Sequence, residues 1–301
     1  MVKNLSKKLM RSQGKIIDTE SYLNTLVAQL LVAHFFGSTL ASKKTTDNWI
    51  GLTKEFSQLS LQEQFQLTRS QGSIFGSLEK PYKAILAFIE DLIAAHRKLF
   101  HIDAKGKITC SLHQNCPLAR ARIQTREFAI ELTRFHICLY AILKFALLYL
   151  AYRPKDQKKL YENLHKSGEL LDFLILESQR IVAFRTGNIF FKLKTSLDLL
   201  KFKIPKNSTI FLNLHSAFRD KACFTDAMKM KPSRFLSNPN KKSLLTTVLQ
   251  FPKTGDEILQ SVLASLILQF RFKRTEKSLP EQFPGLYGSP ACEISWERRR
   301  D

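Results

Sequence analysis

The chain has 301 residues, of which 44% are apolar and 23 are phenylalanine, so it can bury one large core or two small ones. Lys and Arg number 47 against 26 Asp and Glu, which gives a formal net charge of +21. This charge favours anionic partners such as nucleic acid, acidic lipid or an acidic protein, although scattered lysines are also typical of an ordinary solvated surface. The five cysteines lack paired spacing, which argues against a disulfide framework and for a reducing compartment.

The amino-terminal residues 1–15 carry five basic groups and no acid, and we expect them to form a flexible tail. No apolar stretch follows the basic residues, so the pattern is not that of a signal peptide. The most apolar segment, 137–152, is interrupted by Lys144 and is too short to cross a bilayer. We therefore expect no transmembrane segment and a cytoplasmic location.

Apolar residues at helical spacing predict a series of helices through the first two thirds of the chain. The longest, 125–153, is apolar nearly all round, so it is expected to be a central buried helix that ends before Pro154. The polar, turn-rich stretch 101–117 is expected to be a loop. The other expected helices are 22–40, 83–100, 156–164 and 170–184.

The pattern changes in the last third of the chain, where alternating apolar and polar residues predict strands at 189–194 and 209–214. Helical spacing returns over 256–272, and the proline-containing tail from Thr275 is expected to be extended or irregular. Together these elements predict a single, mostly helical domain with a small β-sheet over residues 16–301.

A pair of opposite charges stands in the expected helix 170–184. Glu177 and Arg180 are spaced to share one helical face, which is the arrangement of many weak surface ion pairs. Here the surrounding sequence, FLILESQRIVAF, is strongly apolar, and a buried pair is costly unless other groups hydrogen-bond to it. Arg234, in the segment PSRF, is a candidate partner.

These residues resemble, in order and spacing, the cytochrome P-450 family of haem-thiolate monooxygenases. Glu177 and Arg180 resemble the family's E-x-x-R helix, and PSRF, which contains Arg234, resembles its P-E-R-F motif with Ser in place of Glu. The resemblance implies a mostly α, cytochrome P-450-like fold that lacks the family's amino-terminal third and is clearest over 125–272. It also implies that these three side chains form a structural triad and that the long helix before Pro154 crosses over the haem.

The stretch that follows PSRF departs from the family's pattern, F-x-x-G-x-x-x-C-x-G, in which the Cys thiolate is the axial ligand of the haem iron. Here the sequence before the last helix is LQFPKTGDE, where Phe251 and Gly255 are remnants of the haem loop and Lys253 stands near the Cys position. Cys223 precedes PSRF and Cys292 follows the last helix, so neither lies at the ligand position. A Lys cannot donate the electron density by which a thiolate favours O–O cleavage.

The long helix also departs from the family at the A-G-x-x-T stretch that activates oxygen. Counting back from the proline that ends the helix, this stretch falls on Arg134, Phe135, His136, Ile137 and Cys138. A large aromatic replaces the Gly that makes room for oxygen, and the acid and the alcohol of the proton relay are both missing. The resemblance therefore implies a remnant oxygen-activation stretch beside a missing metal ligand.

Arg134 has two interpretations. In a peroxide-using branch of the family an Arg holds a fatty-acid carboxylate, and Arg134 is similar to this Arg in position. An Arg inside a buried helix needs an anionic partner, which such a carboxylate would supply. Alternatively, Arg134 pairs with Glu131 or lies near the surface, and an alignment anchored on Glu131 shifts the register by three residues. His136 is expected to be a hydrogen-bonded core histidine rather than an iron ligand.

Other chemistry is weakly signalled. Cys110, His113 and Cys116, with His101 upstream, offer zinc donors, but their spacing is not that of the common zinc motifs. Free thiols in a loop are the simpler interpretation. The sequence contains no phosphate-binding glycine loop, nucleophile elbow or H-E-x-x-H motif.

The sequence therefore predicts a degenerate cytochrome P-450-like protein without haem-thiolate catalysis, which needs no cofactor and acts as a binding protein or as a helper subunit for a protein partner. One alternative is a haem-dependent monooxygenase or peroxygenase of the same family, which would bind haem and a fatty acid or another hydrophobic ligand. A second alternative is a basic protein that binds nucleic acid or an anionic membrane surface.

Overall fold

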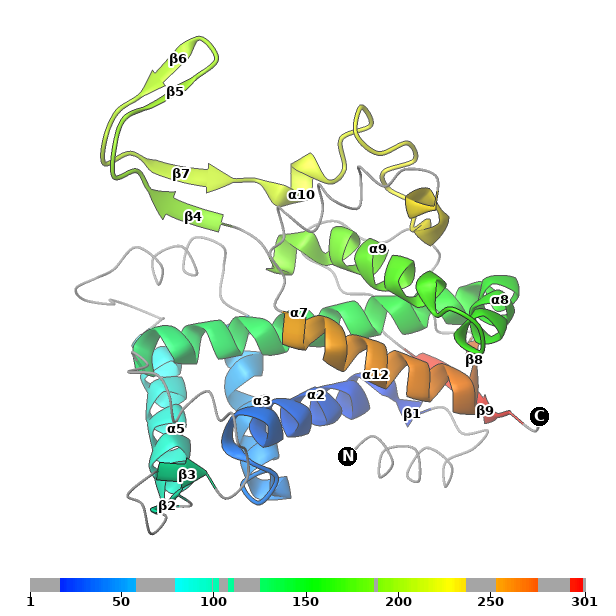
Figure 1. The fold of residues 1–301 in the computed structure, drawn as a ribbon, viewed down its shortest axis with the longest axis horizontal. Coiled ribbons are helices and arrows are strands. Elements are labelled where there is room, and N and C mark those ends of the chain that lie inside the picture. Colours follow the sequence, from blue (N-terminus) through cyan, green and yellow to red (C-terminus); the bar gives the residue numbers. More distant parts are fainter. Residues whose placement is uncertain are drawn as a thin grey trace. The chain divides into compact units, whose positions relative to one another are not determined.

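The computed structural model describes residues 17–57, 79–98, 100–102, 108–110, 125–186, 189–236, 253–275 and 293–299. Most of these residues are helical, and their strands pair in small sheets (Figure 1), which confirms the expected fold class. The chain divides into two compact units, 1–13 with 18–140 and 14–17 with 141–301. This division does not test whether 16–301 folds as one domain, which stays a prediction.

The first unit contains the helices α2 (Thr19–Phe36), α3 (Lys43–Ser57) and α5 (Glu79–Arg97), and the first half of α7 (Thr125–Tyr152). Gly37 ends α2 with a φ of 98°, and its N–H donates to the Ala33 carbonyl at 3.1 Å, which is a helix cap that glycine favours. Ser42 then opens α3, because its hydroxyl accepts a hydrogen bond from the Thr45 N–H at 3.2 Å. The chain therefore reverses within a few residues between the two helices.

Helix α3 was not expected from the sequence. Its buried residues Thr46, Trp49, Thr53 and Phe56 recur at helical spacing, but two of them are threonines. Their hydroxyls are satisfied locally, since Thr46 donates to the Ser42 carbonyl at 3.0 Å and Thr53 donates within its own helix. Threonine at core positions thus hid the apolar periodicity on which the prediction depended.

The stretch expected to be a loop at 101–117 contains part of a β-hairpin, so that expectation is partly wrong. Strand β2 (Phe100–Ile102) pairs antiparallel with β3 (Ile108–Cys110). Both strands are short and contain aromatic or β-branched residues, which favour extended backbone. The polar residues between them outweighed this signal in the sequence.

In the second unit, the helices α8 (Pro154–Leu164), α9 (Glu169–Thr186) and α12 (Lys253–Gln269) pack on one another. Pro154 stands in the first turn of α8 and ends α7 at Tyr152, as predicted. The corner between α8 and α9 is fixed by Asn163, whose side chain accepts from the Leu170 N–H at 3.0 Å. This corner sets the direction of α9, which carries the charged pair.

Helix α7 is longer than the apolar stretch seen in the sequence. Its segment Phe128–Tyr152 has 25 residues. By length and composition alone, it is the one helical segment among the described residues that is long and apolar enough to cross a membrane. The helix thus extends well before residue 137, and the absence of a transmembrane segment stays a prediction. However, 72% of its apolar window is buried within the protein, as in core helices of soluble proteins.

Within the described residues, the strands form four small sheets instead of the single sheet expected from the sequence. The predicted strands pair antiparallel as β4 (Ile189–Lys192) and β7 (Thr209–Leu212), and the chain between them forms a separate hairpin of β5 (Leu197–Leu199) and β6 (Phe202–Ile204). Strand β8 (Phe270–Arg274) pairs antiparallel with β9 (Glu293–Arg298), whose other neighbour is β1 (Ile17–Asp18).

The expected end of the last helix is wrong. Helix α12 ends at Gln269 rather than at 272, because the following residues alternate between a buried Phe270 and Phe272 and an exposed Arg271, which is the period of a strand. The tail, which was expected to be extended or irregular, contains the strand β9, in which Ile294 and Trp296 are buried at the same period. The helical spacing of α12 runs directly into this alternation and masked it.

Candidate functional site

Two oppositely charged side chains lie on the buried face of α9. Glu177 and Arg180 stand at i and i+3, so they project from one side of the helix, and neither is exposed to solvent. Apolar residues before and after them drive this face into the core and take both charges with it. Each charge must therefore find its hydrogen-bond partners inside the protein.

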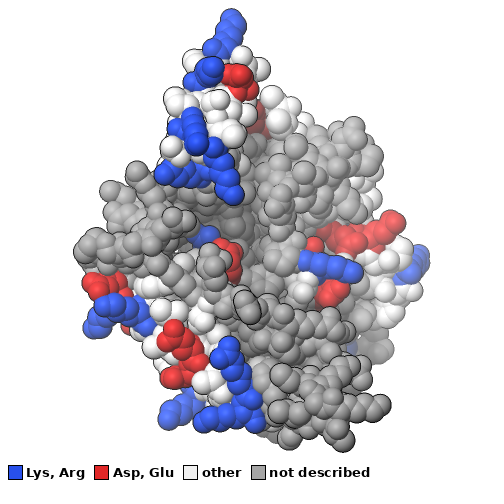
Figure 2. Space-filling view, turned by 60° about the vertical axis from the view of Figure 1, so that its left-hand side comes forward, with Lys and Arg blue, Asp and Glu red and all other residues white. Residues whose placement is uncertain are grey.

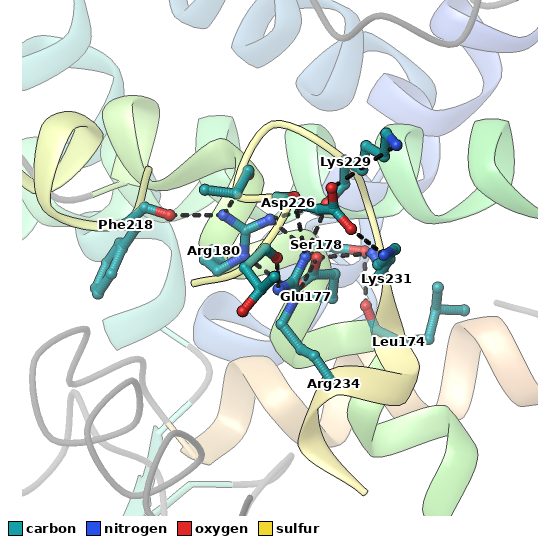
Figure 3. Close-up of polar contacts among 11 residues, drawn as sticks. Leu174, Glu177, Ser178, Arg180, Phe218, Asp226, Lys229, Lys231 and Arg234 are labelled. Atoms are coloured by element: carbon teal, nitrogen blue, oxygen red, sulfur yellow. Dashed lines mark hydrogen bonds and ion pairs between the residues drawn. The ribbon is translucent and has the colours of Figure 1, made fainter. Parts of the chain in front are cut away.

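The Arg180 guanidinium donates two parallel hydrogen bonds to the Glu177 carboxylate (Figure 3). Its Nε donates to Oε2 and its Nη2 donates to Oε1, both at 2.9 Å. Its remaining donors reach the backbone carbonyls of Phe218 at 2.6 Å, Ala227 at 2.9 Å and Lys229 at 3.2 Å. One side chain of α9 thus binds a carboxylate and three points on a distant stretch of chain.

Arg234 completes this cluster from the other side. It lies in the 3-10 helix η2 (Pro232–Phe235), and its Nε donates to the Glu177 Oε1 at 3.0 Å. The Lys231 N–H donates to the same oxygen at 2.8 Å. The two Nη atoms of Arg234 donate to the carbonyls of Thr225 at 2.7 Å, Asp226 at 3.3 Å and Lys229 at 3.1 Å. We call Glu177, Arg180 and Arg234, with these partners, the α9 network.

Aromatic side chains shield the α9 network from solvent. The Phe224 ring lies under both guanidinium groups, with its centroid 5.2 Å from the Arg180 Cζ and 6.0 Å from the Arg234 Cζ. Phe224 also meets Phe218 edge to face, with 6.2 Å between ring centroids. The buried residues of this small core are Leu176, Leu214, Phe218, Phe224, Ala227 and Phe235.

The α9 network fixes a segment that has little regular structure of its own. Between α10 (Leu214–Ala217) and η2 the chain consists mainly of turns, and Asp226 has a φ of 53°, which costs energy for a residue with a side chain. Besides the hydrogen bonds of its own turns, this segment is held by donors of the two guanidinium groups. The arrangement therefore acts as a structural lock between α9 and the segment 218–234.

A third guanidinium lies close to this lock. Arg219 donates from Nη2 to the Ile181 carbonyl at 2.9 Å. Burial, and to a smaller extent the neighbouring Arg180 charge, lower the pKa of Arg219 to about 10. Positive charge thus exceeds negative charge around Glu177, and the backbone carbonyls balance the excess.

The segment that contains this lock was compared with protein-family models. The cytochrome P-450 model matches residues 141–247. This part of the chain is similar to the cytochrome P-450 family. No curated protein matches the chain.

The cytochrome P-450 match covers some of the predicted site residues and not others. Glu177, Arg180 and Arg234 lie inside it, and the structure brings these three together, as the resemblance implied. The remnant oxygen-activation stretch and the remnant haem loop lie outside it. Their residues are Arg134, Phe135, His136, Ile137 and Cys138 in the first case, and Phe251, Lys253 and Gly255 in the second.

Arg134 is not a lone charge inside a buried helix. Its side chain is 33% exposed, and its Nη1 lies 3.1 Å from Oε1 of Glu131, which is itself exposed. The ion pair is the alternative that the sequence left open, and it removes the reason for expecting a bound carboxylate at this position. Of its neighbours, Phe135 and Ile137 are half-buried and Cys138 is buried.

His136 is a hydrogen-bonded core histidine, as expected. The indole Nε1–H of Trp49 donates to its Nδ1 at 3.1 Å, so its Nε2 carries the proton and faces Oδ1 of Asn24 at 3.3 Å. Burial lowers the pKa of His136 to about 3, which keeps the ring neutral. We call Asn24, Trp49 and His136 the first-unit cluster. It joins α2, α3 and α7 through neutral groups.

The residues after PSRF do not fit a haem-thiolate centre. Haem in this family is held by a Cys thiolate, and the sequence has no cysteine between Cys223 and Cys292. Lys253 opens α12 with its side chain 91% exposed and its Nζ 3.9 Å from Glu257, and Gly255 is buried in the first turn of the same helix. Phe251 lies outside the described residues.

No group of three or more His, Cys, Asp or Glu among the described residues is arranged to hold a metal ion. The zinc candidates His113 and Cys116 fall outside the part of the chain that the structure describes. The stretch between Cys223 and Cys292 contains no thiolate donor for a haem iron.

Sequence reasoning missed a buried glutamine that joins three elements of the second unit. Gln157, on α8, donates to the carbonyls of Leu150 at 2.9 Å and Phe272 at 3.0 Å, and accepts from the Phe272 N–H at 2.9 Å. All of its partners are backbone atoms, so no second side chain in the sequence signals the contact. Its neighbours in the sequence, Lys155 to Lys159, are mostly polar and suggest an ordinary surface helix.

Proposed function

We propose that the chain is a degenerate cytochrome P-450-like protein that keeps the family's internal lock and works without haem-thiolate chemistry, as a binding or helper protein. One contrast carries the proposal. The α9 network is fully formed, whereas the sequence between Cys223 and Cys292 contains no cysteine to ligate the haem iron.

The lock can persist without the iron ligand because the two have different roles in the protein. Glu177, Arg180 and Arg234 are tied to each other and to backbone carbonyls, so they stabilise the fold whether or not a cofactor is bound. The thiolate instead holds the haem iron and supplies electron density for its chemistry. A chain that keeps the first and lacks the second supports a role that depends on shape, such as binding another protein.

The haem-dependent alternative draws less support. Arg134 pairs with Glu131 near the surface, so no bound fatty-acid carboxylate is needed to balance its charge. The neighbouring Cys138 replaces the alcohol of the family's proton relay, and it is buried in the helix. A monooxygenase or peroxygenase would need a different iron ligand and a different proton path.

The test is an absorption spectrum of the purified chain with equimolar haemin, reduced under carbon monoxide. The proposal predicts no haem-thiolate Soret band. The matched control is Cys223→Ser, because Cys223 is an exposed free cysteine that can bind added haemin at the surface. A thiolate band that is also present in the Cys223→Ser variant would contradict the proposal directly.

The helper role has its own test. Mixed with a full-length cytochrome P-450 from the same cell, the chain is expected to co-elute with it in size-exclusion chromatography and to change its turnover. The control is the Glu177→Gln variant, which removes the carboxylate of the lock. Loss of co-elution with this variant, but not with Glu162→Gln on the exposed face of α8, ties the complex to the folded second unit.

A further inference from the structure

The hairpin of β5 and β6 has an apolar face that remains accessible to solvent. Leu197 is paired with Ile204, and Leu199 is paired with Phe202. Because side chains alternate across a strand, these four residues lie on one face of the hairpin. Leu197, Leu199 and Phe202 are exposed, and Phe202 reaches 72%. In Figure 1 the hairpin extends away from the other elements of its unit.

The tip of the hairpin adds a leucine where the backbone favours glycine or asparagine. Leu200 has a φ of 53°, a left-handed conformation that costs energy for a branched side chain. Its side chain is 95% exposed, so no packing inside the protein repays this cost. A large apolar residue in a strained and exposed position points to a contact outside the chain.

Lysines surround this apolar face. Lys201 is next to the tip, Lys203 lies on the opposite face across from Asp198, and more lysines stand at the base of the hairpin. In Figure 2, Lys and Arg side chains dominate the projecting end of the molecule at the top of the view. The exposed lysines of the segment 192–206 are Lys192, Lys194, Lys201, Lys203 and Lys206, against one acid, Asp198.

Protection of the exposed strands against aggregation explains only part of this surface. Lysines on exposed strands discourage edge-to-edge pairing, but they do not require exposed leucines. Nucleic acid would use the lysines and one aromatic ring, and would leave Leu199 and Leu200 without a partner. An isolated two-stranded hairpin is only marginally stable in water, so an apolar surface that covers its face would stabilise it.

We propose that the β5–β6 hairpin docks on a membrane surface that contains acidic lipids. Leu199, Leu200 and Phe202 enter the boundary between headgroups and acyl chains, and the lysines bind the anionic headgroups beside them. The long lysine side chains can reach the headgroup layer while the apolar tip lies deeper. This docking does not depend on whether the chain binds haem or a protein partner.

The experiment uses the full chain and sedimentation with vesicles of phosphatidylcholine, with and without phosphatidylserine. We expect binding to the acidic vesicles and little binding to the neutral ones. The double variant Lys201→Glu, Lys203→Glu should weaken binding at least about tenfold, since each lysine near such a surface contributes about fivefold. The double variant Leu200→Asn, Phe202→Ser, which keeps the charge, should weaken it by about tenfold.

The matched control changes the same amount of charge elsewhere in the same unit. Lys155 and Lys159 are exposed on α8, and their reversal to Glu should leave vesicle binding within about twofold of the wild type. Equal losses for the hairpin and the α8 variants would show attraction through net charge alone and would overturn the proposal. Binding to duplex DNA that is lost with the same hairpin variants, without vesicle binding, would also overturn it.

Insertion can be measured with a single probe. Phe202→Trp places an exposed indole on the hairpin, whereas the native Trp49 and Trp296 are buried and do not report on the surface. We expect the emission of the variant to shift to shorter wavelength when acidic vesicles are added. An unchanged emission while the protein sediments with the vesicles would exclude insertion of this face and would overturn the proposal.

Discussion

The two units of the chain each hold a buried polar cluster, and the two clusters are built on opposite principles. In the second unit the α9 network buries full charges, with Glu177 between two guanidinium groups. In the first unit the cluster buries only neutral groups, because the pKa of His136 is lowered by burial to about 3. Charges need several partners to be tolerated inside a protein, whereas neutral groups need only one or two.

This difference explains what each cluster can hold in place. The guanidinium groups have many donors, so the α9 network reaches a long stretch of irregular chain between Phe218 and Arg234. The first-unit cluster joins three helices through two hydrogen bonds at His136. The charged cluster replaces regular secondary structure as a support, and the neutral one adds to helices that already pack together.

The largest effect should follow from removing the charge at the centre of the α9 network. Glu177→Gln keeps the shape but leaves two guanidinium groups without a carboxylate, so we expect a loss of about 3–5 kcal/mol in the unfolding free energy of the second unit. Urea unfolding followed by Trp296 fluorescence, in a Trp49→Phe background, measures it. Glu162→Gln breaks an exposed pair with Lys158 and should cost about 0.5 kcal/mol or less. Equal costs for the two variants would remove the contrast between the clusters.

The second largest effect is a dependence of the stability of the first unit on pH. His136 has a native pKa of about 3, below the unfolded value of 6.5, so the unfolded state binds the extra proton. Stability is therefore complete above pH 6.5 and should fall by about 1.4 kcal/mol per pH unit as the pH drops from 6.5 toward 3. His136→Gln should reduce this slope, because Gln can bond Trp49 and Asn24 without titrating.

Acid titration followed by Trp49 fluorescence, in a Trp296→Phe background, tests the slope. His34→Gln is the control, because His34 is a half-buried histidine of the same unit outside the cluster. It should keep most of the wild-type slope. If His136→Gln and His34→Gln titrate alike, the neutral cluster does not control the acid stability of the first unit.

The third effect separates charge from geometry in the α9 network. Arg234→Lys keeps the positive charge beside Glu177 but loses the fork that reaches the carbonyls of Thr225 and Lys229. We expect a loss of about 1–3 kcal/mol in unfolding free energy, again from urea unfolding at Trp296. Arg298→Lys, at an exposed position on β9, should change it by about 0.5 kcal/mol or less. No loss in Arg234→Lys would show that charge alone holds the segment.

The smallest effect concerns a half-buried carboxylate of the second unit. Asp256, on α12, accepts a hydrogen bond from Gln179 at 2.8 Å, and burial raises its pKa above 3.8. The native state therefore binds the extra proton, and the stability from this group is present at acidic pH and lost as the pH rises through the raised pKa. Asp256→Asn should stabilise the second unit at pH 7 by about 0.5 kcal/mol or less and remove this fall. A clear destabilisation at pH 7 would show that the carboxylate is favourable there.

The sequence predicted the helices with continuous apolar periodicity and missed elements whose cores are mixed. Helix α7 and the stop at Pro154 were predicted because apolar residues and a proline act locally. Helix α3 was missed because threonines occupy half of its buried positions. The pairing of β8 with β9 was missed because it joins segments separated in the sequence, and alternation in a short strand cannot identify a distant partner.

The same limit applies to the candidate site. Glu177, Arg180 and Arg234 were predicted to meet because a charged pair in an apolar helix requires a partner, and the family resemblance supplied Arg234. The backbone carbonyls that complete the network were not predictable, because a carbonyl has no signature in the sequence. Gln157 was missed for the same reason, since it binds only backbone atoms.

The central claim is that the second unit folds on its own lock, without a haem-thiolate. The direct measurement is thermal unfolding of the purified chain, followed at Trp296 in a Trp49→Phe background, with and without equimolar haemin. The account predicts one cooperative transition in the absence of haemin and the same midpoint in its presence, because a ligand that does not bind the native state cannot stabilise it. A transition that becomes cooperative only with haemin, or a midpoint that rises by several degrees, would contradict the account.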